Sequence, residues 1–141
     1  MTFNEVRDYL ASIPCISRGG CGVAAYAMYL WLKKNEQLHK EFKFVLLYKT
    51  DDEDTYQNNM KVLLNEEGNA IACSHIAVFN GDQTVDCDSE IVLSNYGFIQ
   101  FVTESWFMLN ILANVITWNP AFDRDHINTI EHKLDIKILK I

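Results

Sequence analysis

The longest apolar run of the chain follows directly on a glycine-rich stretch. Residues 17–29 read SRGGCGVAAYAMY, and apolar positions continue to Leu32 without leaving a polar face. A helix of this kind is surrounded by other elements in a water-soluble fold. The pattern therefore predicts a central, buried helix that begins at Cys21. The run Val23–Leu32 has about half of the roughly 20 residues that cross a bilayer, so it predicts no membrane span.

Other helices are indicated by caps and by apolar spacing. Thr2–Glu5 has the form of a capping box, which predicts a first helix from Phe3 to about Ser12, before Ile13-Pro14 ends it. Apolar residues at helical spacing predict three further helices. These cover residues 56–64, 103–115 and 126–134.

The strands are predicted mainly after the central helix. Residues 42–49 (FKFVLLYK) form one, and the segments Ala70–Phe79 and Asp82–Asp88 form a hairpin around Asn80-Gly81, a pair that type I′ turns favour. Residues 89–102 add one strand, or two broken at 95–97, and residues 136–141 a last one. This order predicts a single α+β domain over residues 1–141, with a mostly antiparallel sheet packed on the buried N-terminal helix.

The hairpin brings a histidine and a carboxylate together. With Asn80-Gly81 as the turn, Phe79 pairs with Asp82, and His75 lies across from Asp86 with Cβ atoms about 5 Å apart. With Gly81-Asp82 as the turn, Asp88 would oppose His75 instead, and turn chemistry favours Asp86. A carboxylate beside a histidine can fix its tautomer and stabilise its charged form. The alternation of side chains along the strands gives the hairpin a more apolar second face, made of Ile76, Val78, Val85 and Cys87.

Cys21 has the surroundings of a nucleophile. At the first residue of a helix, the unpaired N–H groups and the helix dipole favour the thiolate. Gly19, Gly20 and Gly22 leave room for a substrate carbonyl and offer N–H donors for an oxyanion. The competing interpretations are a small buried cysteine and a hydrogen-bonded structural histidine. The combination of a glycine-flanked thiol, a strand histidine and a cross-strand aspartate favours catalysis.

Composition narrows the class of protein. The 141 residues carry a formal charge of −7, and the basic residues form no stripe that could follow a phosphate backbone, which excludes nucleic acid as the first choice of partner. The N-terminus contains acidic residues and has no secretion signal, so a cytoplasmic protein is expected. Its four cysteines are then expected to be reduced thiols. They are Cys15, Cys21, Cys73 and Cys87.

Two segments resemble the core of the papain-like cysteine peptidase superfamily. CGVAAYAMYLWLK is similar to the cysteine helix of bacteriocin-leader-processing and related peptidases. HIAVFNG is similar to the histidine strand of bacterial cell-wall endopeptidases and transglutaminase-like proteins. The resemblance extends from Pro14 to about Ser89.

The resemblance implies a papain-like fold without a cofactor, and a cysteine peptidase or amidase acting on a peptide or protein substrate. In it Cys21 would be the nucleophile, His75 the base and then the acid, and Asp86 the residue that orients His75. Many papain-like enzymes have a glutamine six residues before the cysteine as an oxyanion donor, and this chain has Cys15 there. Ser17, Arg18 or backbone N–H groups would replace it.

The missing glutamine leaves an alternative function open. A degenerate, non-catalytic papain-like scaffold could serve as a phage or bacterial accessory protein that binds a protein or ligand in the former active-site cleft.

A zinc site is a third interpretation, because Cys15, Cys21, Cys73 and His75 are suitable ligand types. Their spacings, Cys-x5-Cys and Cys-x-His, are not those of the usual zinc knuckles, so no metal is predicted.

Overall fold

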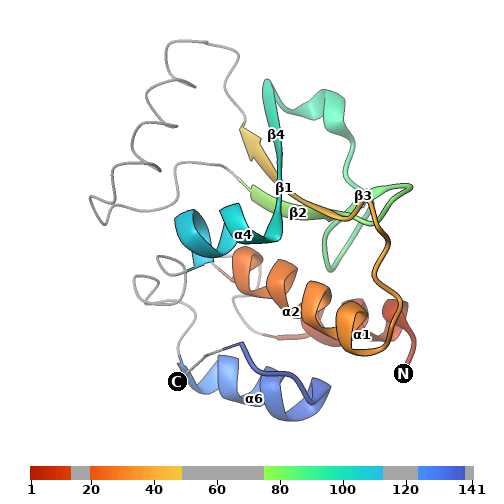
Figure 1. Ribbon diagram of the computed structural model, residues 1–141, viewed down its shortest axis with the longest axis vertical. Coiled ribbons are helices and arrows are strands. Elements are labelled where there is room, and N and C mark those ends of the chain that lie inside the picture. The colour runs from red at the N-terminus through yellow and green to blue at the C-terminus, as the bar shows by residue number, and fades with distance from the viewer. Residues whose placement is uncertain (14–19, 49–74, 113–123, 139–141) are drawn as a thin grey trace.

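The computed structural model describes residues 1–13, 20–48, 75–112 and 124–138 (Figure 1). The helices are α1 (Phe3–Ala11), α2 (Cys21–Lys34), α4 (Glu104–Phe107) and α6 (Arg124–Leu134), with a 3₁₀ turn η1 (Leu93–Asn95) and a π-helical segment η2 (Met108–Leu112). The strands are β1 (Lys43–Tyr48), β2 (His75–Phe79), β3 (Thr84–Val85) and β4 (Phe98–Val102). The mixture of helices and strands confirms the α+β class.

The described strands form one antiparallel sheet in the order β3-β2-β1-β4. β1 is central: Leu46 pairs with Ile76 of β2 on one side and with Gln100 of β4 on the other. The predicted strand over residues 42–49 is thus observed at Lys43–Tyr48, where all side chains after Lys43 are buried. A sheet centre covered on both faces explains why this strand is a continuous apolar run.

Helix α1 begins as its capping residues predict. The Thr2 hydroxyl accepts a hydrogen bond from the Glu5 N–H at 3.2 Å, and the Glu5 carboxylate accepts one from the Thr2 N–H at 3.0 Å. Val6 and Leu10 point into the core at helical spacing. The helix ends at Ala11, one residue before the predicted Ser12.

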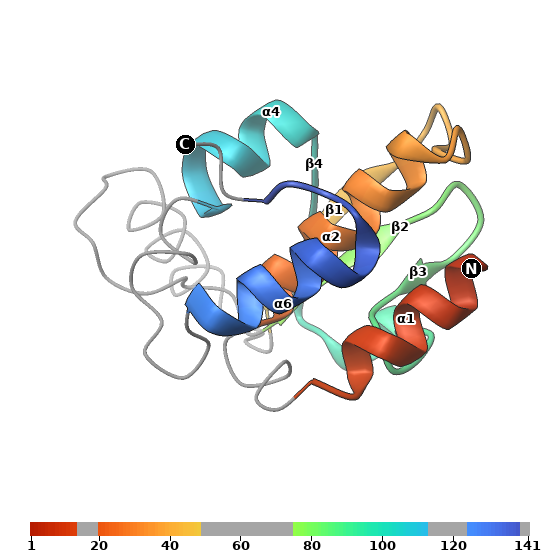
Figure 2. The same cartoon turned by 90° about the horizontal axis from the view of Figure 1, so that it is seen from below.

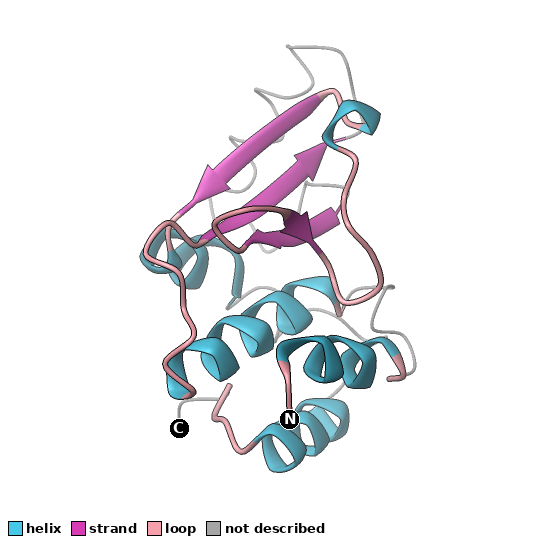
Figure 3. Cartoon of the chain, turned by 90° about the vertical axis from the view of Figure 1, so that its right-hand side faces the viewer, coloured by secondary structure: helices cyan, strands magenta, loops and turns pink. Residues whose placement is uncertain are grey.

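Helix α2 is the central helix that its sequence predicts. It begins at Cys21, and its side chains are buried up to Leu32, with Cys21 and Leu30 half-buried. Figures 1 and 3 show it between the sheet on one side and α1 and α6 on the other. In Figure 2, which looks from below, α6 lies in front of α2 and α1 lies beside it. Burial from every side is the reason that the sequence of α2 has no polar face.

The two faces of the sheet carry separate apolar clusters. The face toward α2 contributes Phe44, Leu46, Ile76 and Val78 to the main core, where Phe44 stacks on Phe107 with ring centroids 4.1 Å apart. On the opposite face, Val45, Leu47 and Ala77 are fully buried. The alternation predicted for the hairpin is therefore confirmed.

Several predicted elements have a different form in the structure. Residues 136–138 are not a strand: Ile138 is buried against the core, and its N–H donates to the Glu131 carboxylate at 2.6 Å. The alternating apolar residues of this segment pack against the main core, and the residues described here form no strand. The helix predicted from Thr103 is the short α4 continued by η2. The helix over 56–64 and the strand residues 70–74 lie outside the described residues.

Over the residues that the structure describes, none of the helices is both long and apolar enough to traverse a lipid bilayer. The strongest candidate in the sequence was the apolar run that is now α2. Ten of its 14 residues are buried in the protein core.

Candidate active site

The hairpin has the second of the two registers weighed from the sequence. Phe79 pairs with Thr84 and Val78 with Val85, so the two central turn residues are Gly81 and Asp82. The prediction of a type I′ turn at Asn80-Gly81 is wrong, because φ is positive at Gly81 (+101°) and not at Asn80. A positive φ at the first central residue alone is the pattern of a type II′ turn. The Asn80 side chain instead caps the turn, accepting from the N–H groups of Asp82 and Gln83.

Asp86 nevertheless is the carboxylate that contacts His75. Continued in the observed register, the pairing would bring Asp88 opposite His75, but β3 ends at Val85. The chain then turns, and Asp86 accepts hydrogen bonds through Oδ1 from the N–H groups of Asp88 at 2.8 Å and Ser89 at 2.7 Å. Its other oxygen, Oδ2, lies 2.9 Å from His75 Nε2. The predicted partner is confirmed, although the predicted register is not.

His75 is the first residue of β2 and is held by two groups. Its pKa is raised to about 9, first because the Asp86 carboxylate accepts its hydrogen bond and second because of a hydrogen bond with Cys21, against burial, which lowers it. At neutral pH the imidazole is therefore protonated, with the Asp86 carboxylate as the hydrogen-bond partner of Nε2.

Asp86 stays ionised over a wide pH range. Burial raises the pKa of its carboxyl, but the hydrogen bonds from His75 and from the N–H groups of Ser89 and Asp88 outweigh burial and lower it to about 2. The side chain is only 17% exposed. A fixed negative charge in that position stabilises the imidazolium of His75.

Cys21 meets the pair from the N-terminus of α2. It is half-buried and is the first residue of the helix, after the N-cap Gly20. A small cavity of about 10 Å³ joins the three groups and has space for about one water molecule. Its lining consists of Cys21, Ala24, Met28, His75, Ile76, Asp86 and Cys87. The structure thus brings together the thiol, the imidazole and the carboxylate that the sequence singled out.

The glycines beside Cys21 lie where N–H donors are available. Gly20 and Gly22 are both buried. The first hydrogen bond along the helix runs from the Ala24 N–H to the Gly20 carbonyl at 2.8 Å, so the N–H groups of Cys21 and Gly22 precede it. Ser17 and Arg18, the other residues considered for oxyanion or substrate binding, lie outside the described residues.

Asp88 has a supporting place in the site. Its side chain is exposed, and its contact with the site is the backbone N–H that donates to Asp86 Oδ1. The alternative in which Asp88 orients His75 is therefore contradicted by the contact that Asp86 makes.

Cys87 is a core residue, as predicted. It is 9% exposed, and burial together with the charges of Asp86 and Asp88 raises the pKa of its thiol to about 12. Cys21 and Cys87 are both free thiols. Two of the ligands considered for zinc, Cys15 and Cys73, lie outside the described residues. Within the described ranges, no three His, Cys, Asp or Glu side chains are grouped to hold a metal ion.

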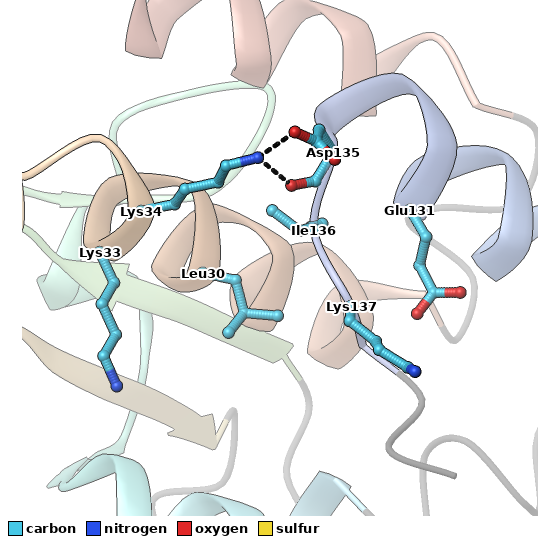
Figure 4. A pocket seen from close by; sticks show the side chains of 7 residues that line it. All are labelled: Leu30, Lys33, Lys34, Glu131, Asp135, Ile136 and Lys137. Carbon is cyan, nitrogen blue, oxygen red and sulfur yellow. Dashed lines mark hydrogen bonds and ion pairs between the residues drawn. The ribbon is translucent and has the colours of Figure 1, made fainter.

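A larger hollow lies at the other end of α2. It has a volume of about 760 Å³ and is formed by the last turn of α2 together with α6 and the residues after it (Figure 4). An α-helix rises 1.5 Å per residue, so Leu30 and Lys34 are about 13–20 Å along the axis from Cys21. Lys34 crosses this hollow to bind the Asp135 carboxylate. It is therefore separate from the thiol site.

Sequence reasoning missed two residues that shape the site. Arg7 of α1 donates from Nε to the Asp86 carbonyl at 2.8 Å and from Nη2 to the Ser89 carbonyl at 3.1 Å. A contact over about 80 positions leaves no local signal. The turn that contains Ser89 could have been found, because an aspartate side chain commonly accepts hydrogen bonds from the backbone just after it.

In comparisons with protein-family models, with curated proteins and with solved structures, none matches this chain. The assignment of function therefore depends on the geometry of Cys21, His75 and Asp86.

Proposed function

We propose that the protein is a thiol-dependent acyl-transfer enzyme on a papain-like scaffold, a cysteine peptidase or amidase that cleaves a peptide or isopeptide-like amide. The observation that carries the proposal is the joint placement of the catalytic groups. His75 Nε2 lies 2.9 Å from Asp86 Oδ2, and both side chains line one small cavity with Cys21, which begins the buried helix α2. A nucleophile, a base and a group that orients the base are the elements of a triad.

In the proposed first step, the Cys21 thiolate, whose proton is held by His75, attacks the carbonyl carbon of the amide, and the carbonyl oxygen becomes an oxyanion. The proton that His75 holds then passes to the amide nitrogen, the C–N bond breaks, and an amine leaves. The product on the enzyme is a thioester between Cys21 and the acyl group. Asp86 keeps the His75 ring in place throughout and stabilises its charged form.

In the second step, water replaces the amine. His75 now takes a proton from the water, whose oxygen attacks the thioester carbonyl, and the C–S bond breaks to release the acid. The N–H groups of Cys21 and Gly22, at the start of α2, are the proposed oxyanion donors. They would serve in place of the glutamine that many papain-like enzymes have at the position of Cys15.

A second candidate is a papain-like scaffold without catalysis, which binds a protein or ligand. The observation in its favour is the small cavity beside Cys21, about 10 Å³, because a substrate amide does not fit into this volume. The two functions differ in one respect that can be measured: only an enzyme forms a covalent acyl intermediate on Cys21.

The test uses p-nitrophenyl acetate, an activated acyl donor that requires no knowledge of the natural substrate. Intact-mass spectrometry after rapid acid quenching should find one acetyl group per chain, mapped to Cys21, with a burst of nitrophenol. His75→Ala should abolish the burst, while His132→Ala, which changes an exposed histidine of α6, should retain it. Acetylation that is equal in the His75 variant, or that maps to other thiols, would refute the enzyme and favour the binding scaffold.

A further inference from the structure

Helix α1 reaches the candidate site through one side chain. Arg7 lies between the buried residues Val6 and Leu10 on α1 and is itself half-buried. Its guanidinium donates two hydrogen bonds, at 2.8 Å to the Asp86 carbonyl and at 3.1 Å to the Ser89 carbonyl. A guanidinium presents several donors in a rigid, planar arrangement, so it can hold two acceptors at a fixed separation.

The two acceptors of Arg7 are the two ends of one turn. The Asp86 N–H donates to the Ser89 carbonyl at 3.0 Å, and the Ser89 N–H donates to Asp86 Oδ1 at 2.7 Å. The pairing of β3 with β2 ends at Val85, and the turn that follows is closed by a bridge between Val85 and Glu90. Arg7 adds to this closure a restraint from outside the hairpin, because it ties both ends of the turn to helix α1.

The position of this turn decides where the Asp86 carboxylate points. Oδ1 is used within the turn, and Oδ2 is directed to His75 Nε2 at 2.9 Å. If the turn moved by about an ångström, the Oδ2–Nε2 contact would leave the range of a hydrogen bond. The Arg7 charge is not itself needed at His75, since its partners are backbone carbonyls.

We infer that Arg7 is a positioning residue, which acts through the Asp86–Ser89 turn to hold Asp86 against His75 and so couples helix α1 to the thiol site. The inference rests on the proposed function only for its effect on acyl transfer. The geometric part, that Arg7 controls the His75–Asp86 contact, stands or fails independently of catalysis.

The test compares Arg7→Met, which keeps the aliphatic length, with Arg7→Lys, which restores one donor. The His75 ring is titrated by NMR, where the wild-type pKa is expected near 9. Arg7→Met should lower that pKa by about one unit or more, and Arg7→Lys by less. If the proposed function is correct, the limb of the pH–rate profile for acetylation of Cys21 that reports His75 should shift by the same amount.

Thr2→Ala is the matched control, because it removes the capping box and so destabilises α1 without touching the turn. It should leave the His75 pKa unchanged. If Arg7→Met lowers stability like Thr2→Ala but does not move the His75 pKa, Arg7 is only structural and the inference is overturned. Should Arg7→Met not fold, Arg7→Gln and Arg7→Lys give the same comparison.

The failure of the proposed function would look different. If Arg7→Met lowers the His75 pKa but neither the wild type nor any variant forms an acyl intermediate, the positioning role of Arg7 holds and the proposed enzyme activity is refuted.

Discussion

His75 and Asp86 are in contact although the strand ladder does not pair them. Their Nε2 and Oδ2 atoms are 2.9 Å apart, whereas the observed register, if continued, would place Asp88 opposite His75. The contact exists because β3 stops at Val85 and the following turn redirects Asp86. The carboxylate of the candidate triad is therefore fixed by a turn, and this has measurable consequences.

Asp86→Asn and Asp88→Asn are predicted to behave differently. The Asp86→Asn variant has a neutral amide in place of the carboxylate that is the largest cause of the raised His75 pKa, so that pKa should fall from about 9 toward its ordinary value. Reactivity of Cys21 should fall by roughly 10²–10⁴-fold. The exposed Asp88 should tolerate the same change with little effect. NMR titration of His75 measures the pKa in both variants, and equal shifts would contradict the assignment of Asp86.

The His75–Asp86 pair should also make the stability of the protein depend on pH. The folded-state pKa of His75 is raised, so its contribution is complete below about 6.5 and is lost as the pH rises through about 9. The folded-state pKa of Asp86 is lowered, so its contribution is present above 3.8 and is lost as the pH falls through about 2. Stabilisation by the pair should therefore be greatest between about pH 4 and 6.5.

Urea denaturation of the wild type and of Asp86→Asn measures this contribution. The difference in the free energy of unfolding should be on the order of 2–3 kcal/mol at pH 5.5. It should be smaller at pH 9.5. A difference that is constant across this range would mean that the two groups do not interact in the folded protein.

Gly81 is predicted to be required for the hairpin. Its φ is +101°, and a Cβ at this position would overlap the ring of His39. Gly81→Ala should lower the free energy of unfolding by about 1–3 kcal/mol. His39→Ala in the same chain removes the overlap but not the backbone strain, so it should restore only part of the loss. Full restoration would show that the backbone of Gly81 carries no strain.

Metal removal should have no effect. The protein is expected to contain no stoichiometric zinc by elemental analysis, and EDTA should leave its melting temperature and the reactivity of Cys21 unchanged. Structural zinc contributes directly to folding, so a bound ion would be evident as a large loss of stability with chelator. Such a loss, restored by zinc, would favour the ligand set Cys15, Cys21, Cys73 and His75 over the triad.

Local signals predicted the elements that position the thiol. The Thr2–Glu5 capping box sets the start of α1, and the absence of a polar face marks α2 as central, with Cys21 at its first residue. These predictions succeed because caps and periodicity are properties of neighbouring residues. Alternation in the hairpin likewise separated Ile76 and Val78 from Ala77 correctly.

Long-range geometry could not be predicted in the same way. The pair Asn80-Gly81 is compatible with more than one turn, and capping by the Asn80 side chain moved the register by two residues, which parity arguments do not detect. The residues 136–138 alternate like a strand but pack against helices. Arg7 contacts a turn about 80 positions away, for which sequence spacing holds no information.

The most direct test of the central claim is the alkylation of Cys21 by iodoacetamide as a function of pH. Peptide mapping would follow Cys21 beside Cys87, which is buried with a pKa of about 12 and should not react at neutral pH, and beside Cys15 as an internal reference. In the wild type, Cys21 should react faster than Cys15 at pH 7, and His75→Ala should slow Cys21 alone. If Cys21 reacts no faster than Cys15, and His75→Ala leaves its rate unchanged, the thiol is not activated and the proposed triad is wrong.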